Sequence, residues 1–269
     1  MIKVEKVKDN LLVSFDYDAD IVDKIKSLPT RKYIADMKSW QIPQHEIKDL
    51  IKLFGDDLDI AEDVDVNYEK PKYDFKTELD TITTPQLKAF AKWCLDVLPD
   101  YFYKVPASST GKYHPKYALG DGGLVRHTIA AVRIANELFN NHTIQNFTDE
   151  EKDIIRVALL IHDGVKQGVD GTGHTTTTHP LEVVEYIEDK YYEVPEETLP
   201  DEVLDLMEDR YLWEDISNCI KSHMGEWNTD YKTKEEVLPK PKTEMQKFTH
   251  LCDYLASRKM LEVNFDVEG

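Results

Sequence analysis

The stretch ALLIHDGVKQG, residues 158–168, decides how this chain folds, because an apolar run there ends in two adjacent polar side chains. Four aliphatic residues lead to His162 and Asp163, and Gly164 comes next. The pair either caps a helix at the protein surface or forms half of a metal site. A buried ionisable group is costly unless it is paired or ligates a metal, so the surroundings of the pair distinguish the two interpretations.

The residues around this stretch have the spacing of amphipathic helices. The segment 148–164 opens with Thr148 and Glu151 at the spacing of a capping box, and Gly164 at its end is typical of a helix stop. Further helices are predicted over 84–98, 122–139, 179–192, 201–211, 213–224 and 243–261. We therefore expect residues 81–269 to form an all-helical bundle, which makes the chain mainly α.

A small α/β domain is predicted for residues 1–55. It contains a strand over 11–18, a helix over 18–30, a second strand or hairpin over 31–43, and an amphipathic helix over 44–55. Residues 56–80 are acidic, contain Pro71 and show no clear period, which favours a linker between the two domains.

Composition indicates a globular protein with no membrane association. No apolar stretch approaches the ~20 residues that span a bilayer, and the first ten residues lack the apolar core of a signal peptide. Three cysteines, Cys94, Cys219 and Cys252, lie far apart in helix-like apolar contexts, which predicts buried free thiols and a cytoplasmic location. The oligomeric state stays open.

The net charge of −19 argues against loose binding to long nucleic acids, whose affinity depends on Lys and Arg. Residues 104–117 nevertheless carry three lysines, Lys104, Lys112 and Lys116, and no carboxylate. Such a local basic loop favours a small anionic target or a strand end.

Six ionisable residues stand out because they lie on or beside predicted helices in mostly apolar surroundings. They are His127, His162, Asp163, His179, His223 and Asp253. Each has a plain alternative when taken singly; for example, Asp253 would pair with Arg258 or Lys259 at the surface. Several such groups on separate helices can share the cost of burial by converging on a divalent cation, and imidazole with carboxylate suits Mn, Fe, Co, Ni or Zn.

The segments GGLVRHT, ALLIHDGVK and THLCDYLASRK together resemble the HD-domain superfamily of metal-dependent phosphohydrolases, over roughly residues 84–260. The stretch 105–128 is similar to the beginning of many HD proteins of bacteria and phages, which implies the cytoplasm of a bacterial or phage-infected cell. The resemblance implies one or two divalent ions (Mn, Fe, Ni, Co, Zn or Mg). It also implies that His127, His162, Asp163 and Asp253 are the motif ligands, and that His179 and His223 are the additional histidines of two-metal members.

Lys166 falls near the lysine of the commoner family pattern, although Gly164 is displaced by one position here. The chemistry implied is that a divalent ion lowers the pKa of bound water from 15.7 to about 7, and that two ions about 3.5–4 Å apart hold the attacking and leaving oxygens. Asp163 suits the bridging role between two ions, because a carboxylate has two oxygens. Asp163 and Lys166 are thus the predicted catalytic residues.

Substrate contacts are predicted from the remaining polar residues. Lys112, Lys116, Lys166 and Arg126 are candidate phosphate clamps, with a solvated surface cation as the alternative for each. His114 is expected at the mouth of the site. His174 lies in a polar loop before His179, which either closes over substrate or is an ordinary surface loop. His250, three residues before Asp253, is expected to support the ligands rather than to bind metal.

Residues 11–55 show a second, weaker resemblance, to the small HARP-type domain found beside annealing helicases, which is linked to DNA-fork binding. The resemblance implies that Arg31, Lys32, Lys38, Tyr33 and Trp40 are basic and stacking groups for a single strand. The alternative is that Tyr33 and Trp40 pack the small core.

The function predicted from these features is metal-dependent hydrolysis of a phosphoester, on a nucleic-acid end or a nucleotide, with a phosphodiesterase or nuclease preferred. The expected partner is accordingly a nucleotide or a single-stranded nucleic-acid end. One alternative is a nucleotide phosphohydrolase, namely a nucleotidase, a dNTPase or a cyclic-nucleotide phosphodiesterase, which the acidic net charge favours. The others are a di-iron oxygenase and a binding module without turnover.

Overall fold

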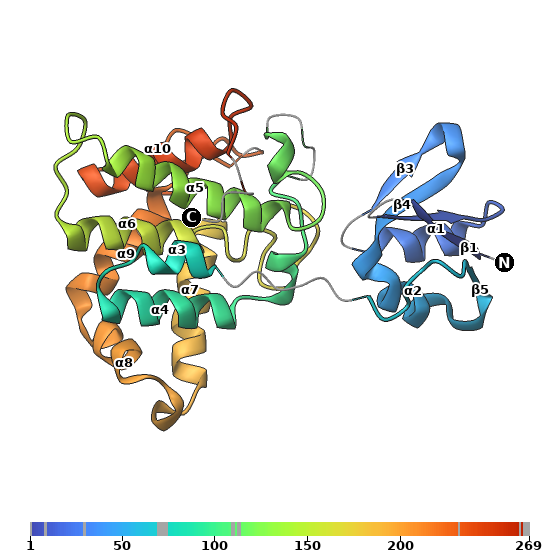
Figure 1. Ribbon diagram of the computed structural model, residues 1–269, viewed down its shortest axis with the longest axis horizontal. Coiled ribbons are helices and arrows are strands. Elements are labelled where there is room, and N and C mark those ends of the chain that lie inside the picture. The colour runs from blue at the N-terminus through green and yellow to red at the C-terminus, as the bar shows by residue number, and fades with distance from the viewer. Residues whose placement is uncertain are drawn as a thin grey trace. The chain divides into compact units, whose positions relative to one another are not determined.

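A computed structural model gives the fold of the chain and describes residues 2–7, 10–28, 31–68, 75–108, 111, 114–230, 232–263 and 265. The chain divides into two compact units, Met1–Lys72 and Tyr73–Gly269. Figure 1 shows a small unit of strands and short helices and a larger unit of helices. The prediction of a mainly α protein with a small N-terminal sheet domain is confirmed.

The first unit is built on a five-stranded sheet with the strand order β3-β4-β2-β1-β5. The strands are β1 (Ile2–Val7), β2 (Asn10–Ser14), β3 (Lys32–Ile34), β4 (Ser39–Pro43) and β5 (Leu58–Ile60). All neighbouring strands are antiparallel except β1 and β5, which are parallel.

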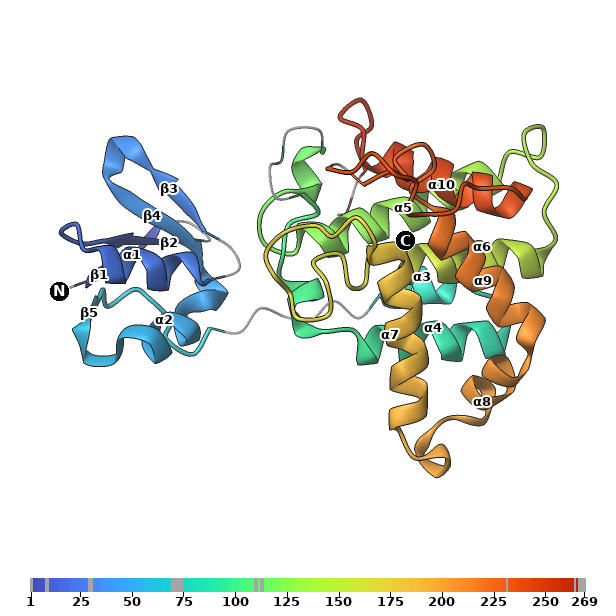
Figure 2. The ribbon, with the colours of Figure 1, turned by 180° about the vertical axis from the view of Figure 1, so that it is seen from behind.

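The core of the first unit follows from alternation along the strands. Val4, Leu11 and Val13 are buried, and they form one cluster with Ile25 of α1 (Ala19–Lys26) and Leu50 of α2 (Ile47–Phe54). Both helices therefore cover the same face of the sheet (Figures 1 and 2).

The structure corrects the predicted boundaries of the domains. The segment 56–80 was predicted to be a linker, but it contains β5, where Leu58 pairs with Ile2, and α3 (Lys76–Asp80), which belongs to the helical unit. The strand β5 is three residues long and has an acidic residue at its centre, so it has too few positions to show a period. It forms because β1 offers it an edge.

The second unit is a bundle of helices. Besides α3 they are α4 (Pro85–Val97), α5 (Gly123–Phe139), α6 (Asp149–Ile161), α7 (His179–Glu193), α8 (Asp201–Glu208), α9 (Arg210–Ser222) and α10 (Glu244–Ala256). Short 3-10 turns, Asp100–Tyr103 and Lys116–Ala118, lie between α4 and α5.

Helix α6 is the central helix of the bundle, since it packs against α4, α5, α9 and α10 (Figures 1 and 2). Its last five residues, Val157 to Ile161, are fully buried. A helix that is apolar on all sides is a buried one, which explains the aliphatic run before His162. The predicted capping box of Thr148 and Glu151 is present at the other end. The His162–Asp163 pair therefore lies in the core, directly after the end of the central helix.

Gly164 has a role different from the predicted helix stop. Its backbone is not among the residues with positive φ, and His162 ends α6 in an ordinary right-handed conformation. A Cβ atom at this position would lie 2.5 Å from Cδ2 of Leu98 and 3.0 Å from Cγ2 of Val183. Close packing, rather than backbone conformation, therefore requires a glycine after the pair.

A buried carboxylate ties α6 to the start of α4. The Oδ2 atom of Asp153 accepts hydrogen bonds from the backbone N–H and the hydroxyl of Thr83 and of Thr84, over 2.9–3.0 Å. Its Oδ1 atom accepts from the guanidinium of Arg156 at 2.7 Å. Both oxygens are thus fully satisfied, as a buried charge requires.

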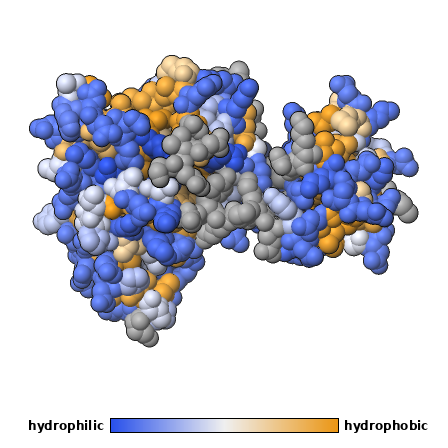
Figure 3. Space-filling model, in the orientation of Figure 1, coloured by the Kyte–Doolittle hydropathy of each residue, from blue (hydrophilic) through white to orange (hydrophobic). Residues whose placement is uncertain are grey.

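The three cysteines are free and buried, as predicted. Burial raises the pKa of the Cys94 thiol, and that of Cys219 to about 12, so these thiols stay protonated. Hydrophilic residues cover most of the surface visible in Figure 3, with smaller apolar patches among them. Within the described ranges, no helix combines the length and the apolar composition needed to cross a membrane.

Candidate metal centre

Six ionisable residues meet in the interior of the helical unit. His127 lies in α5, His162 and Asp163 follow α6, His179 begins α7, His223 follows α9, and Asp253 lies in α10. Five of them are buried, and the side chain of Asp253 is 17% exposed. Their ligand atoms form three overlapping groups that could hold a metal ion. The tertiary structure therefore brings together all six residues that the sequence singled out.

Three histidines are oriented in the same way. Nδ1 of each donates to the backbone carbonyl three residues earlier: His162 to Leu159 at 2.8 Å, His179 to Thr176 at 2.7 Å and His223 to Ile220 at 2.7 Å. A carbonyl oxygen can only accept, so Nδ1 must carry the proton. In the neutral ring, Nε2 then carries no proton, and its lone pair points into the cluster.

The Nε2 atoms of these three histidines and of His127 lie around the two oxygens of Asp163. The Oδ1 atom lies 3.0 Å from Nε2 of His179 and 3.8 Å from Nε2 of His223. The Oδ2 atom lies 3.4 Å from Nε2 of His162 and 3.6 Å from Nε2 of His127. The carboxylate of Asp163 thus stands between two pairs of histidines.

Asp253 closes the second side of the cluster. Its Oδ1 atom lies 2.9 Å from Nε2 of His127 and 3.4 Å from Nε2 of His162. His162 is therefore placed between two carboxylates, and the group His162, His223 and Asp253 shares members with both of the other groups.

The charges of the cluster are strongly coupled. Burial opposes charge on both carboxyls, but Lys166 and His162 beside Asp163, and His127 and His162 beside Asp253, hold the pKa of each carboxyl well below its usual range. Burial also opposes charge on His162, yet the two carboxylates outweigh it and raise the pKa of His162 to about 10. Burial lowers the pKa of His223 to about 3, helped by the nearby His162.

The residues fit a divalent cation. Nε2 of His179 and Oδ1 of Asp163 lie 3.0 Å apart, are buried and, among the residues that the structure describes, have no hydrogen-bond partner. Acceptor atoms that face one another without a donor repel unless positive charge lies between them. Imidazoles and carboxylates together are the ligand set of Mn, Fe, Co, Ni and Zn, so a metal would satisfy the orphaned atoms.

Comparison with protein families agrees with this geometry. The family model of the HD domain matches residues 124–258, which include all six residues of the cluster. The chain belongs to the HD-domain family. The HD domain is a metal-dependent phosphohydrolase, so the predicted enzyme class is confirmed. A search of curated proteins and a search of solved structures each found no match.

The cluster of the HD domain opens into a pocket of about 480 Å³. Lys166 lines it, and its ammonium group donates to Oδ2 of Asp163. His114 lines it too, with its ring 5.7 Å from that of His127. Burial, followed by the charge of Lys166, lowers the pKa of His114 to about 4, so this ring is neutral at pH 7. Lys166 and His114 therefore both line the pocket, and their contacts with substrate stay predictions.

Arg126, His174 and Lys112 were also predicted to contact substrate. Arg126 does not line the pocket: its guanidinium donates to the backbone carbonyls of Tyr117, at 2.6 Å, and Leu119, at 2.9 Å. Its predicted role as a phosphate clamp is therefore corrected to bracing the loop before α5. His174 is exposed and does not line the pocket, whereas its neighbour Thr175 does. Lys112 lies outside the described residues.

His250 supports the cluster without joining it, as expected. Its Nδ1 atom donates to the backbone carbonyl of His223 at 2.6 Å, and its Nε2 atom lies 3.2 Å from Oε2 of Glu226. A Cβ atom on Gly225, whose φ is +58°, would lie 2.2 Å from the ring. The imidazole thus fills the turn after α9 and holds His223 in place.

Among the pocket-lining residues that were not predicted from the sequence, three have aromatic or charged side chains. They are Trp227, Tyr254 and Arg258. Arg258 was considered only as a surface partner of Asp253, but its guanidinium carbon instead lies 4.0 Å from the centroid of the Tyr254 ring. Two of these residues could have been found from the sequence because they lie close to predicted ligands: Trp227 follows His223 by four residues, and Tyr254 adjoins Asp253.

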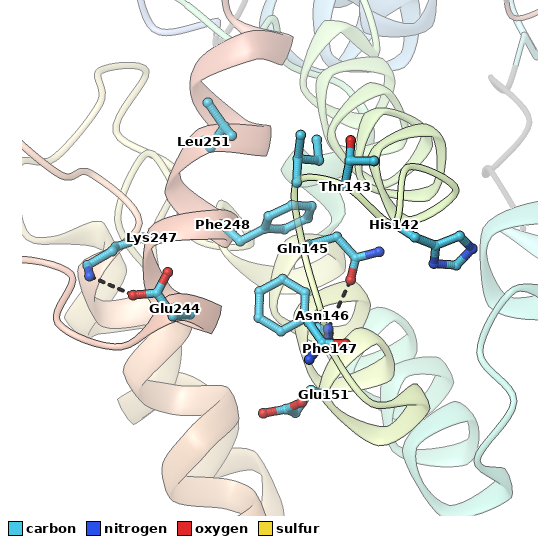
Figure 4. A pocket seen from close by; sticks show the side chains of 11 residues that line it. His142, Thr143, Gln145, Asn146, Phe147, Glu151, Glu244, Lys247, Phe248 and Leu251 are labelled. Atoms are coloured by element: carbon cyan, nitrogen blue, oxygen red, sulfur yellow. Dashed lines mark hydrogen bonds and ion pairs between the residues drawn. The ribbon is translucent and has the colours of Figure 1, made fainter.

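A larger pocket, of about 670 Å³, lies between the loop 142–147 and α10 (Figure 4). Phe147 and Phe248 form its apolar side, with ring centroids 5.1 Å apart, and Lys247 pairs with Glu244 at its rim. None of the six cluster residues lines it. Size alone therefore does not mark the reactive site of this domain.

Proposed function

We propose that the HD domain cleaves a phosphodiester at the end of a single-stranded nucleic acid and that it uses two divalent ions. His179 and His223 would hold one ion with Oδ1 of Asp163. His127, His162 and Asp253 would hold the other with Oδ2 of Asp163. When bound, such ions lower the pKa of a coordinated water and neutralise charge on a phosphoryl group.

The observation that carries the diester proposal is a pair of pockets that share His114. The first, of about 480 Å³, is lined by the cluster residues His179 and Asp253, and the second, of about 520 Å³, is lined by Lys116 and Lys259. A phosphodiester carries a substituent on each side of phosphorus, whereas a monoester carries one. Room on both sides of His114 therefore suits a diester.

The chain's own side chains divide the work in this arrangement. The ammonium group of Lys166 binds a phosphoryl oxygen beside Asp163, and Lys116 and Lys259 bind the next phosphate of the strand. The neutral ring of His114 separates the two pockets and orients the scissile group by hydrogen bonding. Its Nδ1 atom has no hydrogen-bond partner among the described residues.

The experiment is a screen of the full chain with Mn²⁺ against end-labelled single-stranded DNA and RNA, dinucleotides, cyclic nucleotides and nucleoside phosphates. We expect mononucleotides to be released from one end of the strands. The double variant Lys116→Gln, Lys259→Gln should slow cleavage of a strand of three or more nucleotides and leave a small nucleotide ester unaffected. Equal slowing of both substrates would contradict the two-pocket proposal.

A nucleotide phosphohydrolase is the second candidate, and the net charge of −19 favours it, because a small substrate requires few phosphate contacts. In the same screen this candidate predicts turnover of nucleoside phosphates or cyclic nucleotides and no products from strands. Mapping of product ends distinguishes the two candidates.

We also propose that the first unit binds a single strand. Lys32 and Lys38 are exposed, and Tyr33 is 50% exposed, so these three groups can reach a nucleic acid. Trp40 is half-buried against the small core, and the guanidinium of Arg31 donates to the carbonyl of Leu28. Changing Lys32 and Lys38 to Gln in the full chain should weaken strand binding and flatten its salt dependence. Cleavage of a dinucleotide should not change.

A further inference from the structure

Trp227, Tyr254 and Arg258 form a stacked wall of the pocket in the HD domain. The rings of Trp227 and Tyr254 are nearly parallel, with centroids 5.5 Å apart and planes 9° apart. The guanidinium carbon of Arg258 lies 4.0 Å from the centroid of Tyr254 and 5.2 Å from that of Trp227. All three line the pocket together with the cluster residues His179 and Asp253.

The fold attaches this wall firmly to the metal ligands. Trp227 follows the turn at Gly225, which connects it to His223, and His250 fills that turn. Tyr254 adjoins Asp253 in α10, and Arg258 follows the end of the same helix. The wall is therefore built from the segments that carry two of the six cluster residues, and its position relative to the cluster is set by short chain connections.

Two properties indicate that the wall faces a ligand. Trp227 is 43% exposed, although packing in a core would bury so large an apolar residue. The Nε atom of Arg258 is buried and lacks a hydrogen-bond partner in the described part of the chain. An open aromatic face beside a guanidinium with an unused donor, at the edge of a phosphohydrolase site, matches a base next to a phosphate.

We propose that Trp227 is a stacking platform for the nucleobase adjoining the scissile phosphate, and that Arg258 holds the platform in place and donates to that phosphate. This inference rests on the proposed function, since it gives the substrate a base. Every base has a π face, so the platform selects nucleotides over base-free phosphoesters without reading sequence.

The test compares two non-hydrolysable probes that differ only in the base: a nucleoside phosphonate and the matching base-free sugar phosphonate. Their affinities for the full chain with Mg²⁺ are measured by calorimetry, and indole fluorescence is recorded in parallel. The variants are Trp227→Ala and Trp227→Phe, with Tyr192→Ala, at an exposed position of α7, as the matched control.

We expect Trp227→Ala to weaken binding of the nucleoside phosphonate about tenfold and to leave the base-free phosphonate unchanged. Trp227→Phe keeps a stacking ring, so it should retain most of the affinity while losing the fluorescence response. Tyr192→Ala should behave as wild type. Equal affinities of wild type and Trp227→Ala for the nucleoside probe, or equal losses for both probes, would overturn the proposal.

The readout separates this inference from the proposed function. If the substrate screen shows no strand cleavage but nucleoside affinity still depends on Trp227, the stacking platform is supported and the proposed reaction is contradicted. A protein that cleaves strands with no contribution from Trp227 would retain the reaction and lose the platform.

Discussion

The Nε2 atom of His127 lies 2.9 Å from Oδ1 of Asp253, although the two residues are 126 positions apart along the chain. This contact joins α5 to α10, which pack directly against each other in the bundle. The cluster is thus closed by the first and last of its residues in the sequence. The metal centre consequently depends on the packing of the whole helical unit.

Asp163→Ala should reduce metal-dependent hydrolysis by more than about 100-fold, since Asp163 stands between both pairs of histidines. The measurement is product release with Mn²⁺ under saturating metal. Asp170→Asn, at an exposed aspartate in the loop that follows, is the control and should retain activity. Full activity of Asp163→Ala would show that Asp163 is not required for hydrolysis.

Removal of metal should lower the thermal stability of the helical unit alone. A ligand at 100 times its Kd contributes about 2.7 kcal/mol, and 1 kcal/mol shifts the Tm of a domain of this size by about 2–4 °C. Reloading after chelation should therefore raise the Tm of the helical unit by about 5–10 °C and leave the transition of the first unit unchanged. Calorimetric titration gives the number of ions: a stoichiometry of one would contradict the two-ion arrangement.

The metal-free protein should lose stability as the pH rises from 6.5 towards 10. Coupling to Asp163 and Asp253 raises the pKa of His162 from 6.5 to about 10, so within this window the native state holds a proton that the unfolded chain has released. The contribution is complete below pH 6.5 and is lost towards pH 10. Denaturant titrations between pH 6.5 and 8.5 measure it.

Metal binding should show the opposite pH dependence, because a coordinating imidazole must be deprotonated. The rise in Tm on adding metal should thus increase with pH over the same window in which the metal-free protein weakens. A Tm increment that does not change with pH would show that His162 does not release a proton to the metal.

Lys166→Gln should lower kcat/KM about 100-fold while metal affinity stays within a few-fold of wild type. Lys166 lines the pocket and its ammonium group pairs with Asp163, so the change removes a positive charge that contacts the cluster. Lys190→Gln, at a surface ion pair with Glu193, is the matched control. Kinetics and metal titration together distinguish a role in turnover from a role in metal binding. A large loss of metal affinity would indicate that Lys166 helps to assemble the metal centre.

Asp153→Ala should destabilise the helical unit by about 3–5 kcal/mol. The change leaves the donors of Thr83, Thr84 and Arg156 without their buried acceptor. The site lies away from the metal cluster, so metal-dependent activity at low temperature should persist. Equilibrium unfolding in urea checks the stability, and a loss below 1 kcal/mol would mean that water or another acceptor replaces the carboxylate.

Patterns that act over one or two helical turns were predictable. The helices α4 to α10 follow from apolar spacing, and the capping box of Thr148 and Glu151 follows from its four-residue pattern. The six cluster residues were also recognisable, because several histidines and aspartates on or beside separate apolar helices can share the cost of burial by converging on a cation. These features have local causes, so neighbouring residues carry the information.

Other features arise from contacts between segments far apart in the chain, and no local pattern records them. The strand β5 exists because it pairs with β1, Arg126 turns to the carbonyls of Tyr117 and Leu119 rather than to substrate, and Gly164 is small because Leu98 and Val183 approach it. The wall of Trp227, Tyr254 and Arg258 likewise forms where α9 and α10 end side by side. Residue types in the sequence thus predict the metal chemistry, whereas three-dimensional packing sets the shape of the pocket that binds the substrate.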